Sequence, residues 1–193
     1  NSSHLQSFKK QVIVLKALHI IPNLNKGGAE RIALDICIAQ SKQKELEVKL
    51  VCFSDVNMYA ELSARVDITV VPVTLELSLW KPNKVNVDGL QSFIDDYSPD
   101  VIHSHLFTAE IVSRFCTFLS AKWFTHGHDN MIQFKKFSLK TLMNKTQLAN
   151  YFERHLLFKN YKKNGGTTIV AISKDTQQYF DENAFSNKIC ILL

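Results

Sequence analysis

The chain has 193 residues, of which 46% are hydrophobic and 21% charged, so it fits a globular protein with one large domain. Its net charge of +5 is modest, and we expect no nucleic-acid partner. No apolar run approaches the ~20 residues of a membrane span, and the polar start lacks the apolar core of a signal peptide. We therefore expect a cytoplasmic protein with an N-terminal tail over 1–11 and a domain over 12–193.

The alternation of apolar strands and amphipathic helices predicts the fold. Strands are expected at 12–20, 48–53, 67–73, 101–105, 122–126, 168–172 and 188–193. Helices are expected at 29–41, 59–65, 90–97 and 174–181, with two more whose apolar faces include 111–119 and 148–156. Residues 74–86 have no clear period and contain Pro82, which predicts a surface excursion. The order predicts a doubly wound parallel α/β sheet, Rossmann-like, with ligands at the carboxyl ends of its strands.

Two glycines follow the first strand. Gly27 and Gly28 stand just before the first expected helix, where a bare backbone and free N–H groups suit a negatively charged ligand. A tight turn that needs glycine is an equally good interpretation. The full G-x-G-x-x-G pattern is absent, which disfavours NAD binding.

Histidines mark the ends of two strands. His103 and His105 alternate on one strand and point the same way, and His126 and His128 follow the next strand. Zinc binding is one interpretation, but only Asp129 stands nearby as a carboxylate, so we expect no metal. Each histidine is otherwise a hydrogen-bonded structural residue.

The sequence motifs of other enzyme classes are missing, and the remaining candidate residues have structural interpretations. The sequence has no G-x-S-x-G, P-loop or H-E-x-x-H pattern. Ser173 is expected to cap the helix that follows it, and His155 to lie on a helix surface. The four cysteines lie far apart among apolar neighbours, which predicts buried free thiols.

Positive charge gathers between residues 134 and 163. This segment includes Lys135, Lys136 and Lys140 and has Glu153 as its one acidic residue. It is interpreted as a solvated helix face or as a site for an anionic partner such as a membrane surface. Apolar residues such as Phe134 among the lysines suit the second interpretation.

Taken together, short motifs resemble glycosyltransferase family four, of the GT-B fold. The motifs are Ile20-Ile21-Pro22, Gly27-Gly28-Ala29-Glu30-Arg31, Pro99-Asp100-Val101-Ile102-His103-Ser104-His105, Phe124-Thr125-His126-Gly127 and Val170-Ala171-Ile172-Ser173. Their order and spacing resemble the family over nearly the whole chain.

The resemblance implies a retaining enzyme that moves a hexose from a nucleotide diphosphate sugar to a saccharide or lipid-linked acceptor, without a cofactor. The N-terminal domain would hold the acceptor, and the C-terminal donor-binding domain is expected to be missing, so that this chain alone is inactive. His126 would lie beside the donor sugar, and Gly27 and Gly28 near the donor phosphates and acceptor. His105 and Asp129 would contact the acceptor.

Two alternatives remain. The first is a non-catalytic subunit that binds the acceptor or a membrane and needs a donor-binding partner. The second is a metal hydrolase that uses the histidine pairs.

Overall fold

The computed structural model describes residues 14–128, 130–136, 138, 144–183 and 189–191. A seven-stranded, fully parallel sheet in the order β3-β2-β1-β6-β7-β8-β9 forms its centre. Its strands are β1 (Leu15–Ile21), β2 (Leu46–Cys52), β3 (Asp67–Val70), β6 (Val101–His105), β7 (Lys122–Gly127), β8 (Thr168–Ala171) and β9 (Ile189–Ile191). The order reverses at β1 and β6, as in a doubly wound sheet, so the predicted fold class is confirmed.

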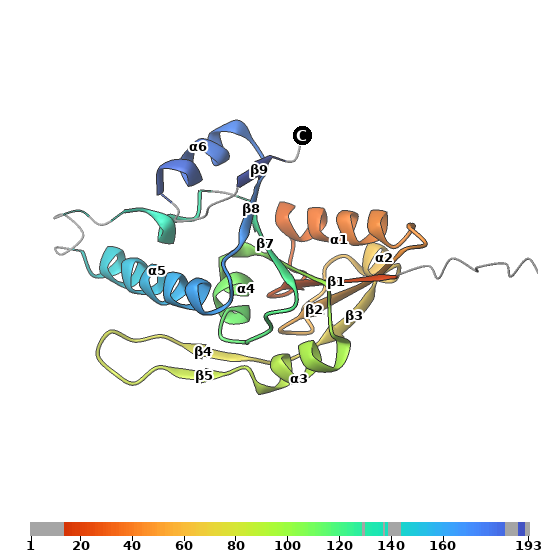
Figure 1. Cartoon of the computed structure of the whole chain (residues 1–193), viewed down its shortest axis with the longest axis horizontal. Helices are drawn as coiled ribbons and strands as arrows, with labels where there is room; N and C mark the ends of the chain where they lie inside the picture. Colours follow the sequence, from red (N-terminus) through yellow and green to blue (C-terminus); the bar gives the residue numbers. More distant parts are fainter. Residues whose placement is uncertain (1–13, 129, 137, 139–143, 184–188, 192–193) are drawn as a thin grey trace, which may run out of the picture.

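Helices cover both faces of this sheet (Figure 1). They are α1 (Gly28–Gln40), α2 (Ala60–Ser63), α3 (Asp88–Tyr97), α4 (Leu106–Ser113), α5 (Lys145–Lys163) and α6 (Lys174–Asn183), with a short 3-10 helix η1 (Ile132–Phe134). On one face, Ala33, Leu34 and Cys37 of α1 pack on Ala17 and Ile21 of β1. The alternate residues of β1 pack with α3 and α4 on the other face.

Residues 74–86 lie at the surface, as predicted, but they form a hairpin that the sequence did not indicate. Strands β4 (Thr74–Glu76) and β5 (Lys84–Asn86) pair antiparallel as a hairpin that reaches alongside α5 (Figure 1). Each strand has three residues, which is too short for an alternating pattern to be recognised. The hairpin tip carries Trp80, which is 87% exposed.

The predicted extent of the fourth helix is wrong. α4 begins at Leu106, directly after β6, and ends at Ser113. Leu119, which was expected on its apolar face, is 70% exposed. No side chain caps the start of α4, so the sequence carries no capping signal there. Leu106 also has a φ of +69°, which non-glycine residues rarely adopt.

Two smaller predictions are confirmed. The Ser173 hydroxyl accepts a hydrogen bond from the Thr176 backbone N–H at 3.1 Å and so caps α6. Cys37, Cys52 and Cys116 are buried free thiols, whereas the side chain of Cys190 lies outside the described residues. Among the described helices, none has the length and apolar character needed to cross a bilayer.

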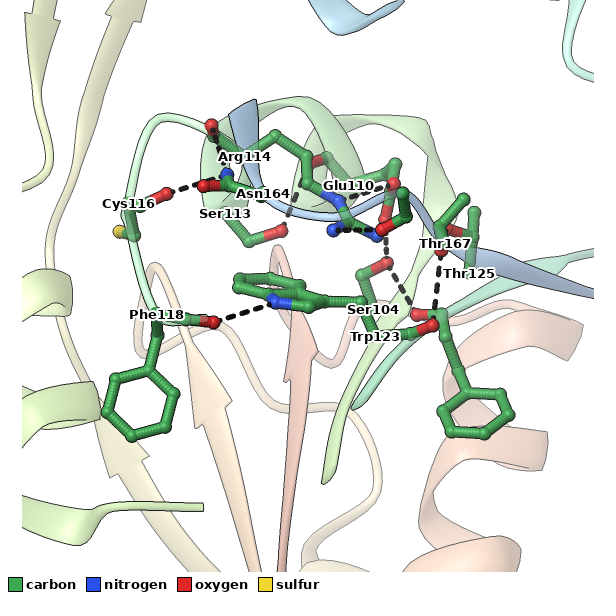
Figure 2. Close-up of polar contacts among 12 residues, drawn as sticks. Ser104, Glu110, Ser113, Arg114, Cys116, Phe118, Trp123, Thr125, Asn164 and Thr167 are labelled. Atoms are coloured by element: carbon green, nitrogen blue, oxygen red, sulfur yellow. Dashed lines mark hydrogen bonds and ion pairs between the residues drawn. The ribbon is translucent and has the colours of Figure 1, made fainter. Parts of the chain in front are cut away.

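A buried ion pair joins α4 to the sheet on the face away from α1. Glu110 and Arg114 lie one helical turn apart, both side chains are 0% exposed, and their closest N and O atoms are 2.9 Å apart. The Ser104 hydroxyl donates to the other carboxylate oxygen of Glu110 (Figure 2). The guanidinium also donates to the Gly166 carbonyl and lies 4.2 Å from the Trp123 ring centroid.

This ion pair provides a stability prediction. Replacing one partner of a buried pair leaves the other charge without compensation, so Glu110→Gln should lower the free energy of unfolding by about 3–5 kcal/mol. The matched control is Asp35→Asn, which breaks the Arg31–Asp35 pair of the same i, i+4 spacing with side chains 56% and 51% exposed. It should cost less than about 0.5 kcal/mol. Equal losses in urea unfolding would show that burial does not govern the Glu110 pair.

Candidate functional site

The strand register brings residues of four strands together at two neighbouring levels near the carboxyl edge of the sheet. His19 of β1 pairs with His103 of β6, and His105 pairs with His126 of β7. His126 in turn pairs with Val170 of β8. Because side chains alternate along a strand, these histidines all face the side of the sheet that α1 covers.

The result is a cluster of five histidines, His19, His103, His105, His126 and His128. The rings of His103 and His105 lie 4.5 Å apart between centroids, and those of His126 and His128 lie 4.2 Å apart. The expected proximity of the two pairs is therefore confirmed. His19 was missed: with Lys16 it is one of the two polar side chains in an otherwise apolar strand.

Hydrogen bonds connect three of these rings into a chain. His19 Nε2 lies 2.7 Å from Gln40 Oε1, and since a carbonyl oxygen only accepts, His19 donates from Nε2. His19 Nδ1 then accepts from His105 Nε2 at 2.9 Å, and His105 Nδ1 accepts from His128 Nε2 at 3.3 Å. One glutamine at the end of α1 thus sets the tautomers of three histidines.

The remaining ring nitrogens have no such partners. Within the described residues, both ring nitrogens of His126 are buried without a hydrogen-bond partner, as are His103 Nε2 and His128 Nδ1. His126 is 1% exposed. Unpaired polar atoms in a buried position are costly and often mark a site for a ligand.

Burial keeps the imidazoles neutral at pH 7. It lowers the pKa of His126 to about 3, with the neighbouring His128 and His19 adding to the shift. Burial lowers the pKa of His128 to about 4, and that of His19 to about 4 despite the hydrogen bond to Gln40. The pKa values of His103 and His105 are also well below the usual range, first through burial and then through the other histidines.

Two sets of three rings have the spacing that a metal ion requires. They are His19 with His103 and His105, and His105 with His126 and His128, and within each set the ligand nitrogens lie within 4.8 Å of one another. Neutral imidazole is a good ligand for zinc and similar ions.

The glycine turn lies at the same carboxyl edge, after β1. Gly27 is the N-cap of α1, and no side chain caps the helix. The Tyr59 hydroxyl fixes the turn: it donates to the Gly27 carbonyl at 2.6 Å and accepts from the Gly27 N–H at 3.1 Å. A Cβ at Gly28 would meet nothing within 4 Å, so the backbone there faces open space.

The loop after β7 is partly described. Asp129 and Lys140 lie outside the described residues. Lys135 and Lys136 are exposed, as expected. Phe134 is 1% exposed and meets the Phe158 and Phe180 rings edge-on, so the prediction that it accompanies the lysines at a surface is wrong. An aromatic side chain can fill the core beneath a basic loop, which sequence alone does not distinguish.

Comparison with known protein families agrees with the resemblance found in the sequence. Residues 26–192 match the profile described as Glycosyltransferase Family 4. No curated protein sequence matches the chain.

Several solved structures resemble the fold. The Anabaena protein HepE, in complex with UDP and glucose, has a TM-score of 0.60 at 16% identity over 92% of this chain and 44% of its own. Sucrose-phosphate synthase from Thermosynechococcus elongatus has a TM-score of 0.57 at 10% identity over 92% and 47%. A glycosyltransferase from Rickettsia africae has a TM-score of 0.52 at 17% identity over 92% and 42%. The chain thus spans less than half the length of each.

The histidine cluster makes stability depend on pH. In the unfolded chain the five clustered histidines take up protons below about pH 6.5, whereas in the folded chain His19 and His128 do so only near pH 4 and His126 near pH 3. The free energy of unfolding should therefore fall between pH 6.5 and 4, by about 1.4 kcal/mol per pH unit for each extra proton bound to the unfolded state. Urea unfolding in EDTA, which keeps metal ions away, measures this slope.

A pair of variants isolates the contribution of the histidines from that of the carboxylates. His128→Asn should make the slope shallower, and His155→Ala, at an exposed position on α5, should leave it unchanged. A His128→Asn slope equal to that of the unmodified chain would contradict the lowered pKa.

Proposed function

Because the chain belongs to Glycosyltransferase Family 4 and has the fold of a GT-B N-terminal domain, we propose that it is the acceptor side of a retaining glycosyltransferase. The enzyme would move a hexose from a nucleotide diphosphate sugar to a saccharide or lipid-linked acceptor. The donor is a substrate, and the reaction as proposed uses no cofactor.

One observation carries this proposal: His126 stands at the carboxyl edge with both ring nitrogens buried and unpartnered among the described residues. A neutral imidazole donates from one nitrogen and accepts at the other, which suits the hydroxyl groups of a sugar. In the proposed role, His126 orients the donor sugar through such hydrogen bonds.

The environment of His126 suits orientation better than attack. Its pKa of about 3 makes the ring a weak base and hence a weak nucleophile. Departure of a nucleoside diphosphate leaves an oxocarbenium-like sugar, which gains from fixed polar groups that do not react with it. His105, whose ring is held by His19 and by His128, is proposed to support the acceptor side.

The glycine turn is proposed to face the phosphates. At Gly28 the backbone is open, and the first N–H groups of α1 have no side-chain cap. Uncapped helix N–H groups favour negative charge. These two features support a role for Gly28 near the donor diphosphate or the acceptor. The same role for Gly27 requires the Glu30 carboxylate, which lies against Gly27, to move aside.

The length of the relatives supports a division of labour between two domains. The chain covers 44% of HepE, which was solved with UDP and glucose and, separately, with UDP-glucose. We propose that a second domain supplies the main contacts to the nucleotide, and that this chain contributes His126 and the glycine turn.

A second candidate is recruitment to an anionic membrane, at its inner face. Lys135 and Lys136 are exposed next to Ile132, which is 61% exposed. Trp80 lies across a cavity of about 280 Å³ from Lys145, at the start of α5. Basic residues with exposed apolar and tryptophan side chains suit a charged lipid surface.

The central prediction concerns turnover in the full-length enzyme. His126→Ala should lower turnover at least tenfold, which corresponds to about 1.4 kcal/mol of lost transition-state stabilisation. His155→Ala is the matched control and should change turnover little. Thermal unfolding must show that both variants fold. Normal turnover of a folded His126→Ala enzyme would make His126 structural and contradict the site assignment.

The membrane candidate predicts a charge-dependent interaction. The double variant Lys135→Glu with Lys136→Glu should bind phosphatidylglycerol vesicles at least about tenfold more weakly, because each basic residue near such a surface contributes about 1 kcal/mol. The control exchanges Lys42 and Lys44, which are exposed between α1 and β2, for glutamate. Co-sedimentation that is equal for phosphatidylcholine, or insensitive to salt, would count against recruitment.

A further inference from the structure

We propose that His105, His126 and His128 form a binding site for a divalent transition-metal ion of the zinc class. The ion would have three imidazole ligands and one open position. The proposal concerns ion binding by the chain itself, and its test needs no transferase activity. An ion here would take one ring nitrogen of His126 and would therefore compete with the sugar contact proposed above. The three rings come from the ends of β6 and β7 and from the residue directly after β7.

One pair of ring nitrogens is spaced as a tetrahedral ion would require, and the third ring lies close by. The ligand nitrogens of the three rings lie within 4.8 Å of one another. His105 Nδ1 and His128 Nε2 are 3.3 Å apart. With Zn–N bonds of about 2.0–2.1 Å, two ligands of a tetrahedral ion stand about 3.3–3.4 Å apart. This pair thus already has the required separation.

The hydrogen-bond acceptors that would orient the ligand histidine His105 are also in place. A metal-binding histidine usually donates its other ring N–H to a fixed acceptor, which sets its tautomer and orientation. His105 donates from Nε2 to His19 at 2.9 Å, and His19 donates to Gln40 at 2.7 Å. This leaves the Nδ1 lone pair of His105 directed toward His128 and the proposed ion.

The other two ligands have the necessary free nitrogens. Within the described residues His126 is 1% exposed and neither of its ring nitrogens has a partner, so a lone pair is available on one of them. For His128 to bind through Nε2, its proton moves to Nδ1, which is also without a partner. The tautomer changes, and no proton leaves the site.

The alternative set, His19 with His103 and His105, fits an ion less well. Both nitrogens of His19 are already used, one by Gln40 and one by His105. His19 is also buried, whereas His128 is only partly buried and offers a route from solvent.

The ligand chemistry defines the class of ion. Imidazole nitrogens suit zinc, copper, nickel and cobalt, while Mg²⁺ and Ca²⁺ prefer oxygen ligands. Such an ion would tie the ends of β6 and β7 to the start of the following loop. It would therefore stabilise the folded chain by binding to it in preference to the unfolded chain.

Cobalt provides the direct test, because tetrahedral Co²⁺ with nitrogen ligands absorbs visible light more strongly than the aqueous ion. Titration of the purified, EDTA-treated chain should give saturable absorption at one equivalent, displaced by Zn²⁺ with a dissociation constant below about 10 µM. Zn²⁺ should also raise the thermal unfolding midpoint.

Three variants make the test specific. His128→Asn, at the partly buried ligand, should weaken Zn²⁺ binding at least about 100-fold, and Gln40→Ala, behind His19, about 10-fold. His155→Ala, at an exposed histidine, should bind as the unmodified chain does. Binding that is lost in His155→Ala, unchanged in both other variants or absent at 100 µM Zn²⁺ would overturn the proposal. If His128→Asn does not fold, the Zn²⁺ affinity of Gln40→Ala alone decides the test.

Discussion

The parallel register of β1, β6 and β7 is the constraint on which the candidate site depends. It pairs His19 with His103 and, two residues further along β6, His105 with His126, so that polar rings from three strands meet at two neighbouring levels. Because side chains alternate, a slip of one residue in β6 would turn His103 and His105 to the opposite face, where the apolar core of α3 and α4 lies. The hydrophobic pattern that fixes the sheet therefore also fixes the cluster.

Buried polar groups are compensated in different ways on the two faces of the sheet. On the α4 face, Glu110 and Arg114 compensate each other's charge, and Ser104 and Gly166 provide further hydrogen bonds. On the α1 face, the histidines stay neutral, and three of them are joined through hydrogen bonds that begin at Gln40. Among the described residues, the first arrangement leaves Arg114 Nη2 without a hydrogen-bond partner, while the second leaves both nitrogens of His126 available. We infer that the α4 face stabilises the domain and that the α1 face carries its chemistry.

Sequence periodicity predicted the strands of the parallel sheet and the facing of His103 and His105, because burial on both faces produces distinct apolar runs. It missed the β4–β5 hairpin and the start of α4, where three-residue strands and an uncapped helix leave no local signal. It also missed His19 as a member of the cluster, because the pairing of β1 with β6 follows from strand order, which no local pattern encodes. The unpartnered nitrogens of His126 depend on the same packing and became visible only in three dimensions.

The most direct test of the central claim is an NMR titration of the purified chain with UDP-glucose, followed through the side-chain ¹⁵N signals of its histidines. Because we propose that the nucleotide is held mainly by another domain, binding should be weak, in the range of about 1 mM, which corresponds to about 4 kcal/mol. The ring signals of His126 should nevertheless shift, while those of exposed His155 stay in place. Sub-micromolar binding, or shifts at His155 with none at His126, would contradict the account.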